Sequence, residues 1–119
     1  MLNSQDRQRL ETERNLWLAT VRPNGSPHLV PIWFVWHSDR AYLCTAGDSV
    51  KARNIAHNPK IAFALENGDD PVLVEGVAKI LDNVPAEIVA AFEKKFEWNI
   101  QTDGKHNTVI ELTPTRVVL

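Results

Sequence analysis

A short segment of the sequence combines residue types that could bind an anion. Ser49 follows the loop residue Gly47 and is a typical helix cap, and Pro59 limits the helix to about residue 57. The first amide groups of a helix lack helical partners and carry partial positive charge. Lys51 and Arg53 add two cations at this end, which is unfavourable unless an anion lies between them. Arg53 lies one turn after Ser49, so the segment predicts a phosphate site.

A solvent-exposed helix face, with Asp48 balancing Lys51, is the alternative interpretation of this segment. The rest of the sequence offers no catalytic or metal-binding pattern. The four histidines do not form a metal-type spacing with Cys44 or with acidic residues, and Cys44 is interpreted as a core residue. We therefore expect no catalytic side chain and no metal, and any enzymatic reaction would depend on a bound cofactor.

The strand predicted over residues 27–36 is apolar on both faces. Val30 and Ile32 alternate with Pro31 and Trp33, so one face fills the interior and the other meets a partner subunit or a ligand. Pro31 cannot donate to a ladder and should lie at a bulge or a free edge, where backbone groups could contact a ligand. Trp33, and Trp98 beside a polar loop, could each lie against a planar ring.

These segments belong to a mainly β pattern with helical insertions (α+β). We expect one domain over residues 1–119, a six- to seven-stranded antiparallel split β-barrel with two or three short helices. The predicted strands cover residues 16–21, 27–36, 41–45, 60–66, 72–81 and 108–112, with a possible extension over 116–119 after a break at Pro114. The predicted helices cover about 3–15, 49–57 and 85–98, and Gly76 marks a bend or a bulge.

Composition limits the classes of function. A net charge of −2 argues against broad nucleic-acid binding, so an anion would be bound by a local cluster. One cysteine suits a reducing compartment, and the longest apolar run is too short to span a bilayer. We therefore expect a cytoplasmic protein that binds neither nucleic acid nor membrane.

Several motifs together resemble one known family. The hairpin over residues 20–28, the strand segment Pro31-Ile32-Trp33-Phe34 and the segment Ser49-Val50-Lys51-Ala52-Arg53-Asn54, closed by Asn58-Pro59, occur in a characteristic order. Residues 69–76 and Lys95-Phe96-Glu97-Trp98 continue the likeness. The chain resembles the pyridoxamine 5′-phosphate oxidase-like split-barrel flavoproteins, especially small members that bind FMN or the deazaflavin F420.

The resemblance implies a homodimer with cofactor sites at the interface. It implies that Ser49, Lys51 and Arg53 hold the cofactor phosphate, with Val50 as a further cofactor-binding residue. It also implies that Thr45 and the backbone of Val30, Pro31 and Ile32 line the ring. Trp33, and Trp98 from the other subunit, are stacking candidates. The Arg-His substrate motif of authentic pyridoxamine phosphate oxidases does not occur up to Leu119, so oxidation of pyridoxine phosphate itself is not expected.

The leading hypothesis is an FMN-dependent oxidoreductase that transfers hydride to or from a small organic substrate. An F420-dependent reductase is the close alternative, with Arg7, Arg9 and Arg14 available for the acidic tail of that cofactor. A non-catalytic flavin or heme carrier and a small nucleic-acid-binding barrel are the remaining alternatives.

Overall fold

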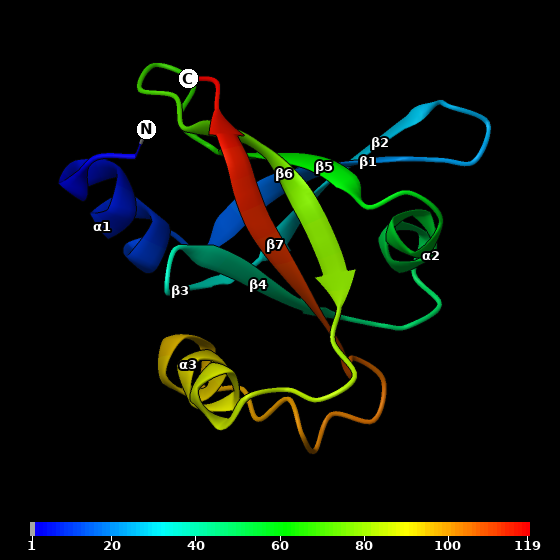
Figure 1. Cartoon of the computed structure of the whole chain (residues 1–119). Helices are drawn as coiled ribbons and strands as arrows, with labels where there is room; N and C mark the ends of the chain where they lie inside the picture. Colours follow the sequence, from blue (N-terminus) through cyan, green and yellow to red (C-terminus); the bar gives the residue numbers. More distant parts are fainter. Residues whose placement is uncertain (1) are drawn as a thin grey trace.

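The computed structural model describes residues 2–119 as one curled sheet with three helices (Figure 1). Every strand pairing in the sheet is antiparallel. The helices are α1 (Ser4–Thr12), α2 (Val50–His57) and α3 (Ala86–Phe96), and the strands are β1 (Asn15–Val21), β2 (Pro27–Trp33), β3 (Val35–His37), β4 (Arg40–Thr45), β5 (Lys60–Leu65), β6 (Leu73–Ile80) and β7 (Thr108–Val117).

The order of the strands forces the sheet to curl. The order is β2-β1-β5-β6-β7-β4-β3, so β2 and β3 lie at opposite ends of the sheet. These two strands are nevertheless consecutive in the chain, separated only by Phe34. The ends of the sheet must therefore meet at Phe34, which gives a half-closed barrel and confirms the predicted split β-barrel.

Apolar side chains fill the inside of the curled sheet. Phe34, Leu43 and Phe63 are almost completely buried there, and Leu10 of α1 and Ile55 of α2 extend this core beyond the sheet. A second cluster lies on the outer side, where α3 packs Phe92 and Ile88 against β3, β4 and β7. The outer side of β2, β1 and β5 has no such cover among the described residues.

The predicted start and end of α2 are confirmed. The hydroxyl oxygen of Ser49 accepts a hydrogen bond from the Ala52 amide at 3.3 Å, as expected for an N-cap. The helix ends at His57, one residue before Asn58 and two before Pro59. No helix among residues 2–119 is long and apolar enough to cross a membrane.

The predicted bulge at Gly76 is confirmed, whereas the predicted break at Pro114 is wrong. The register of β6 and β7 shifts between Glu75 and Gly76, and Gly76 pairs with Pro114. A proline is tolerated where the ladder is already irregular. β7 therefore runs without interruption from Thr108 to Val117.

Other predicted boundaries also differ from the structure. The strand expected over residues 27–36 is divided at Phe34, because the chain passes there from one edge of the sheet to the other. The helix expected to reach Trp98 ends at Phe96, since Glu97 adopts a left-handed conformation with φ of 51°. Pro85 is the N-cap of α3 rather than its first residue.

Substitution of Gly76 by alanine tests the close approach of β6 and β7. A Cβ atom at residue 76 would overlap the carbonyl oxygen of Thr113, which belongs to the backbone and cannot rotate away. We expect Gly76→Ala to lower the free energy of unfolding by roughly 2–4 kcal/mol in urea denaturation. The matched control is Gly68→Ala, because a Cβ there meets no atom within 4 Å. Equal stability of the two variants would contradict the steric explanation.

Candidate functional site

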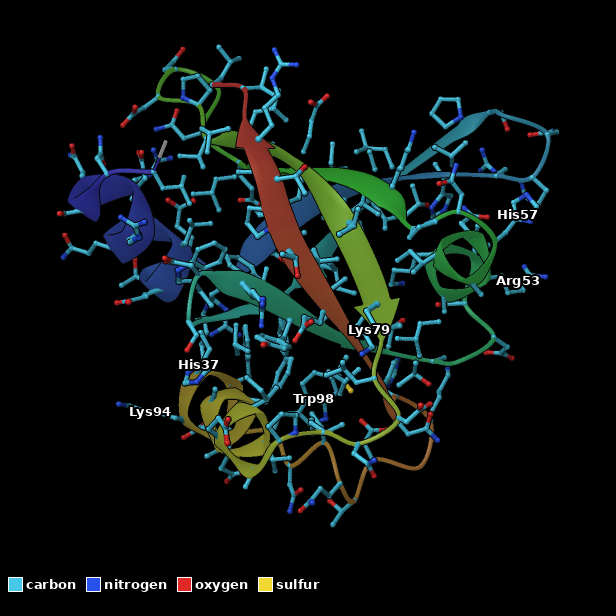
Figure 2. All side chains as sticks on the ribbon, in the orientation of Figure 1. His37, Arg53, His57, Lys79, Lys94 and Trp98 are labelled. Carbon is cyan, nitrogen blue, oxygen red and sulfur yellow. The ribbon has the colours of Figure 1, made fainter. Side chains whose placement is uncertain are left out.

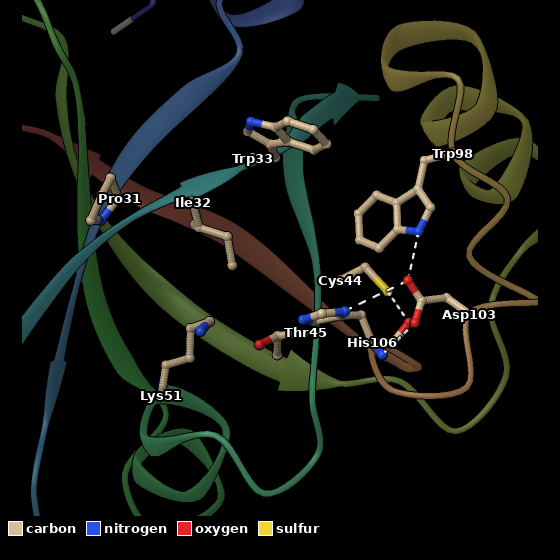
Figure 3. A pocket seen from close by; sticks show the side chains of 9 residues that line it. All are labelled: Pro31, Ile32, Trp33, Cys44, Thr45, Lys51, Trp98, Asp103 and His106. Atoms are coloured by element: carbon tan, nitrogen blue, oxygen red, sulfur yellow. Dashed lines mark hydrogen bonds and ion pairs between the residues drawn. The ribbon is translucent and has the colours of Figure 1, made fainter.

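A pocket lies along the free edge of β2. Its volume is about 540 Å³. It is bounded by β2, the end of β4, the start of α2 and the loop between α3 and β7, called here the α3–β7 loop (residues 97–107) (Figure 3). The lining residues are Pro31, Ile32, Trp33, Cys44, Thr45, Lys51, Trp98, Asp103 and His106.

Lys51 is a cation inside this pocket without a counter-ion. Its side chain points from α2 into the cavity (Figure 3). Among residues 2–119 no carboxylate lies within ion-pair distance of its ammonium group and no hydrogen bond holds it. Partial burial lowers the pKa of Lys51, which shows that its charge has lost water without gaining a partner. The site therefore favours an anionic ligand.

Thr45 and Ser49 lie next to this cation but play different roles. Thr45 is buried at the end of β4 and lines the pocket. Its hydroxyl donates to the Ser49 oxygen at 3.4 Å, and the same oxygen caps α2. The hydroxyl oxygen of Ser49 thus already accepts two hydrogen bonds within the chain. These bonds orient the start of α2 relative to β4.

The structure does not bring Arg53 to the side chain of Lys51. Arg53 is exposed on the outer side of α2 (Figure 2) and lines a second, smaller pocket of about 320 Å³ with Val50 and Arg22. Residues 51 and 53 are two apart and so leave the helix in different directions. The predicted convergence of Lys51 and Arg53 on one phosphate is therefore not seen within this chain.

His28 lies near the start of α2 as a neutral imidazole. Its Nδ1 atom is buried and has no hydrogen-bond partner among the described residues. Burial lowers the pKa of His28, and the charges of Arg22 and Lys51 lower it further. These three side chains come from the β1–β2 hairpin and from α2.

The backbone of β2 offers hydrogen-bonding groups at the pocket. The Phe34 amide donates to the Arg14 carbonyl at 3.2 Å, so even-numbered residues of this segment bond to the β1 side. In an antiparallel pair, the residues between these positions direct their N–H and C=O groups away from the partner strand. The Pro31 carbonyl and the Trp33 amide therefore face the free edge, and Pro31 occupies a position where no amide is needed. Val30, in contrast, does not line the pocket, and its even-numbered position directs its backbone groups toward β1.

Two tryptophans of the same chain form an aromatic corner. The ring of Trp33 stacks on Phe96 with centroids 4.5 Å apart, and Trp98 stands nearly perpendicular to Trp33 at 6.2 Å. The guanidinium of Arg14 lies 4.9 Å from the centroid of Trp33. Trp98 therefore reaches the pocket of its own chain, and no second subunit is needed to bring it there.

Asp103 and His106 line the pocket although the sequence indicated only a polar loop. Asp103 accepts a hydrogen bond from Trp98 Nε1 at 3.0 Å, and its second oxygen accepts the backbone amides of Lys105 and His106. These bonds hold the pKa of Asp103 at about 2. The only sequence signal was the proximity of Trp, Asp and His within one loop, which does not specify these contacts.

Cys44 also reaches the pocket, although it is buried as expected. Its thiol donates to the His106 carbonyl at 3.3 Å. Burial is the main cause that raises its pKa to about 11, and the charge of Asp103 adds to the effect. Within residues 2–119 no group of three or more His, Cys, Asp or Glu side chains could hold a metal ion.

The half-closed antiparallel barrel, with a pocket beside the free edge of β2, places the protein in the class of split barrels. The chain belongs to the pyridoxamine 5′-phosphate oxidase family, whose sequence model matches residues 2–119. No protein of curated function matches the chain significantly.

Solved structures share this fold along nearly the whole chain. A conserved hypothetical protein from Mycobacterium tuberculosis is 26% identical, with a TM-score of 0.78 over 98% of this chain and 83% of the other. A structure named F420 reductase is 24% identical, with a TM-score of 0.75 over 98% of both chains. The heme storage protein HutZ from Vibrio cholerae is 19% identical, with a TM-score of 0.78 over 98% of this chain and 92% of the other.

The reactivity of Cys44 tests the electrostatics of the pocket. A pKa of about 11, against a reference value of 9.0, lowers the thiolate fraction near neutral pH by about 100-fold. We expect iodoacetamide to alkylate the folded protein at least that much more slowly than the urea-unfolded chain, as followed by mass spectrometry. A folded-state rate equal to that of the unfolded chain would show that the thiol is neither buried nor destabilised as a thiolate.

Proposed function

We propose that the protein is an FMN-dependent oxidoreductase that exchanges hydride with a small organic substrate. The observation that carries the proposal is the half-buried ammonium group of Lys51, which has no counter-ion among the described residues and faces a pocket of about 540 Å³. A phosphate group supplies the missing charge, and an apolar cavity of this size suits a ring system.

The residues around the pocket fit the two ends of such a ligand. Lys51 binds the phosphate as a point charge, and the uncapped amides at the start of α2 favour an anion there. The Pro31 carbonyl and the Trp33 amide at the β2 edge would accept from and donate to polar groups of a ring, and Ile32 and Thr45 line the same pocket. When bound, a flavin supplies hydride transfer, and the chain supplies position and exclusion of water.

FMN is favoured over F420 by the distribution of the other cations. F420 has an acidic tail, for which Arg7, Arg9 and Arg14 were the candidate partners. Arg7 is paired with Asp39 at 2.9 Å, and Arg9 is paired with Glu13 at 3.0 Å. Arg14 alone lies near the pocket, beside Trp33. An F420-dependent reductase remains the alternative, and the F420 reductase of the same fold supports it.

A non-catalytic flavin or heme carrier is the second candidate function. The observation that favours heme is the imidazole of His106, which lines the pocket and could bind iron. The heme storage protein of the same fold supports this possibility. A flavin spectrum of the purified protein would support the first proposal, and a heme absorption band would support the second.

We propose a cytoplasmic location, since Cys44 has no partner for a disulfide.

The uncovered outer side of the sheet supports a homodimer. Strand register aligns Pro31, Trp17, Ala64 and Leu73 in one row across four strands, and Leu29, Ala19 and Ala62 in the next row. We call these seven residues the outer apolar face. Leu29 is 59% exposed and Trp17 38% exposed in the single chain. Such a surface is typical of a subunit interface, and Pro31 joins it directly to the pocket. We propose no nucleic-acid partner, given the net charge of −2.

Truncation of Lys51 tests the phosphate site. We expect Lys51→Ala to weaken FMN binding by about 1.5–3 kcal/mol, the scale of a charged hydrogen bond, and to leave the fold unchanged. Because Arg53 lines the other pocket, Arg53→Ala should cost less than Lys51→Ala. Fluorescence titration with FMN measures both affinities.

The control for this titration is Lys94→Ala, which removes an exposed cation of α3 remote from both pockets. Its affinity should equal that of the wild type. If Lys51→Ala binds FMN as tightly as the control, or if the wild-type protein does not bind FMN, the assignment fails.

A charge on the outer apolar face tests the homodimer. We expect Leu29→Glu to convert a dimer into a monomer in sedimentation experiments, because two carboxylates would be buried at the interface. Ala90→Glu places the same charge on an exposed position of α3 and should remain dimeric. A wild-type monomer, or dimers of both variants, would contradict the interface.

A further inference from the structure

The α3–β7 loop forms one wall of the pocket. None of its residues belongs to the proposed cofactor contacts. Lys51, Thr45 and the β2 edge belong to the barrel and to α2, whereas Trp98, Asp103 and His106 all belong to this loop. Figure 3 shows the loop residues across the cavity from Lys51. The two sides also differ chemically, since one carries a cation and the other carries aromatic rings.

The hydrogen bonds that the Asp103 carboxylate accepts all come from residues of the loop. One oxygen accepts two backbone amides, at 3.0 and 2.8 Å, and the other accepts the indole N–H of Trp98 at 3.0 Å. The second oxygen also lies 3.6 Å from Nδ1 of His106. Asp103 therefore acts as a positioning residue that fixes Trp98 and His106, and it is not the group that meets a ligand.

The contact with Asp103 determines which ring nitrogen of His106 carries the proton. A carboxylate next to Nδ1 favours the tautomer with the proton on Nδ1. The opposite nitrogen, Nε2, then carries a lone pair and accepts hydrogen bonds. The His106 side chain is 46% exposed and lines the cavity, so this acceptor is accessible.

The aromatic corner restricts the shape of a ligand beside this acceptor. Phe96 covers one face of Trp33, and Trp98 stands at 71° to Trp33. The N–H of Trp98 is already bonded to Asp103, so Trp98 offers only its π system. Two rings at this angle favour a flat ring that stacks on one and meets the other with its edge.

We propose that Trp33, Trp98 and His106 form a substrate subsite for a planar aromatic compound bearing an O–H or N–H group, with Asp103 as its positioning residue. The substituent donates to Nε2 of His106 and the ring occupies the aromatic corner. The proposal rests on the proposed function, because it gives the substrate class for the same pocket.

Three matched probes test both parts of this specificity by calorimetry. The probe 2-naphthol has a flat ring and an O–H, 2-methoxynaphthalene keeps the ring without the donor, and decahydro-2-naphthol keeps the donor without the flat ring. We expect 2-naphthol to bind about tenfold more tightly than its methyl ether, the usual scale of one hydrogen bond. We expect a preference of up to about tenfold over decahydro-2-naphthol, the usual scale of one aromatic contact. Equal affinity for 2-naphthol and its methyl ether would overturn the role of His106.

Variants distinguish a positioning role of Asp103 from a general contribution to packing. His106→Ala should abolish the discrimination between 2-naphthol and its methyl ether. Asp103→Asn should reduce the same ratio although the imidazole remains, because the amide nitrogen that replaces one oxygen cannot accept from Trp98 or His106. His57→Ala, an exposed histidine of α2 remote from the pocket, should keep the wild-type ratio. An unchanged ratio in Asp103→Asn would overturn the positioning role.

Titrations with and without saturating FMN distinguish this inference from the proposed function. If FMN binds and 2-naphthol still binds with discrimination, both proposals are supported. If FMN does not bind but the discrimination persists, the cofactor proposal fails and the subsite remains supported. If FMN displaces 2-naphthol, the loop wall is not a separate subsite, and the inference is overturned.

Discussion

The connection of β2 to β3 through Phe34 is the constraint on which the pocket depends. The two strands lie at opposite ends of the sheet and are separated by a single residue, so the sheet must curl until its ends meet there. Phe34 is fully buried, and Lys95 donates to its carbonyl at 2.8 Å. The curl brings the end of β4 close to the free edge of β2. A cavity with a backbone edge on one side and the start of α2 on another follows from this topology.

Burial and pairing of charge then distinguish the site from the remaining surface. Arg7 and Arg9 have carboxylate partners, and Lys95 has a carbonyl and the ring of Phe34. Burial lowers the pKa of Lys95 to about 8, yet this ammonium group is stabilised locally. Lys51 is likewise partly desolvated but has no such partner among residues 2–119. That difference is the reason why the proposed phosphate site is assigned to Lys51.

Local chemistry explains which parts of the fold could be predicted from the sequence. The cap at Ser49, the stop before Pro59 and the bulge at Gly76 depend on neighbouring residues, and the structure confirms all three. The division of β2 from β3 and the continuity of β7 through Pro114 depend on distant pairing, which the sequence did not reveal. For the same reason, the contacts of Asp103 could not be predicted. The different directions of Lys51 and Arg53, in contrast, follow from their spacing of two residues in a helix and could have been inferred from the sequence.

The uneven cover of the outer side of the sheet links the pocket to the proposed dimer. α3 buries the outer side of β3, β4 and β7, but the outer apolar face on β2, β1, β5 and β6 has no cover within the described chain. Pro31 belongs both to that face and to the pocket. A second subunit docked on the face would therefore reach the mouth of the pocket beside the β2 edge. The barrel and α2 would then supply the cofactor contacts, while the α3–β7 loop, which is not part of the sheet, could vary in sequence without disturbing them.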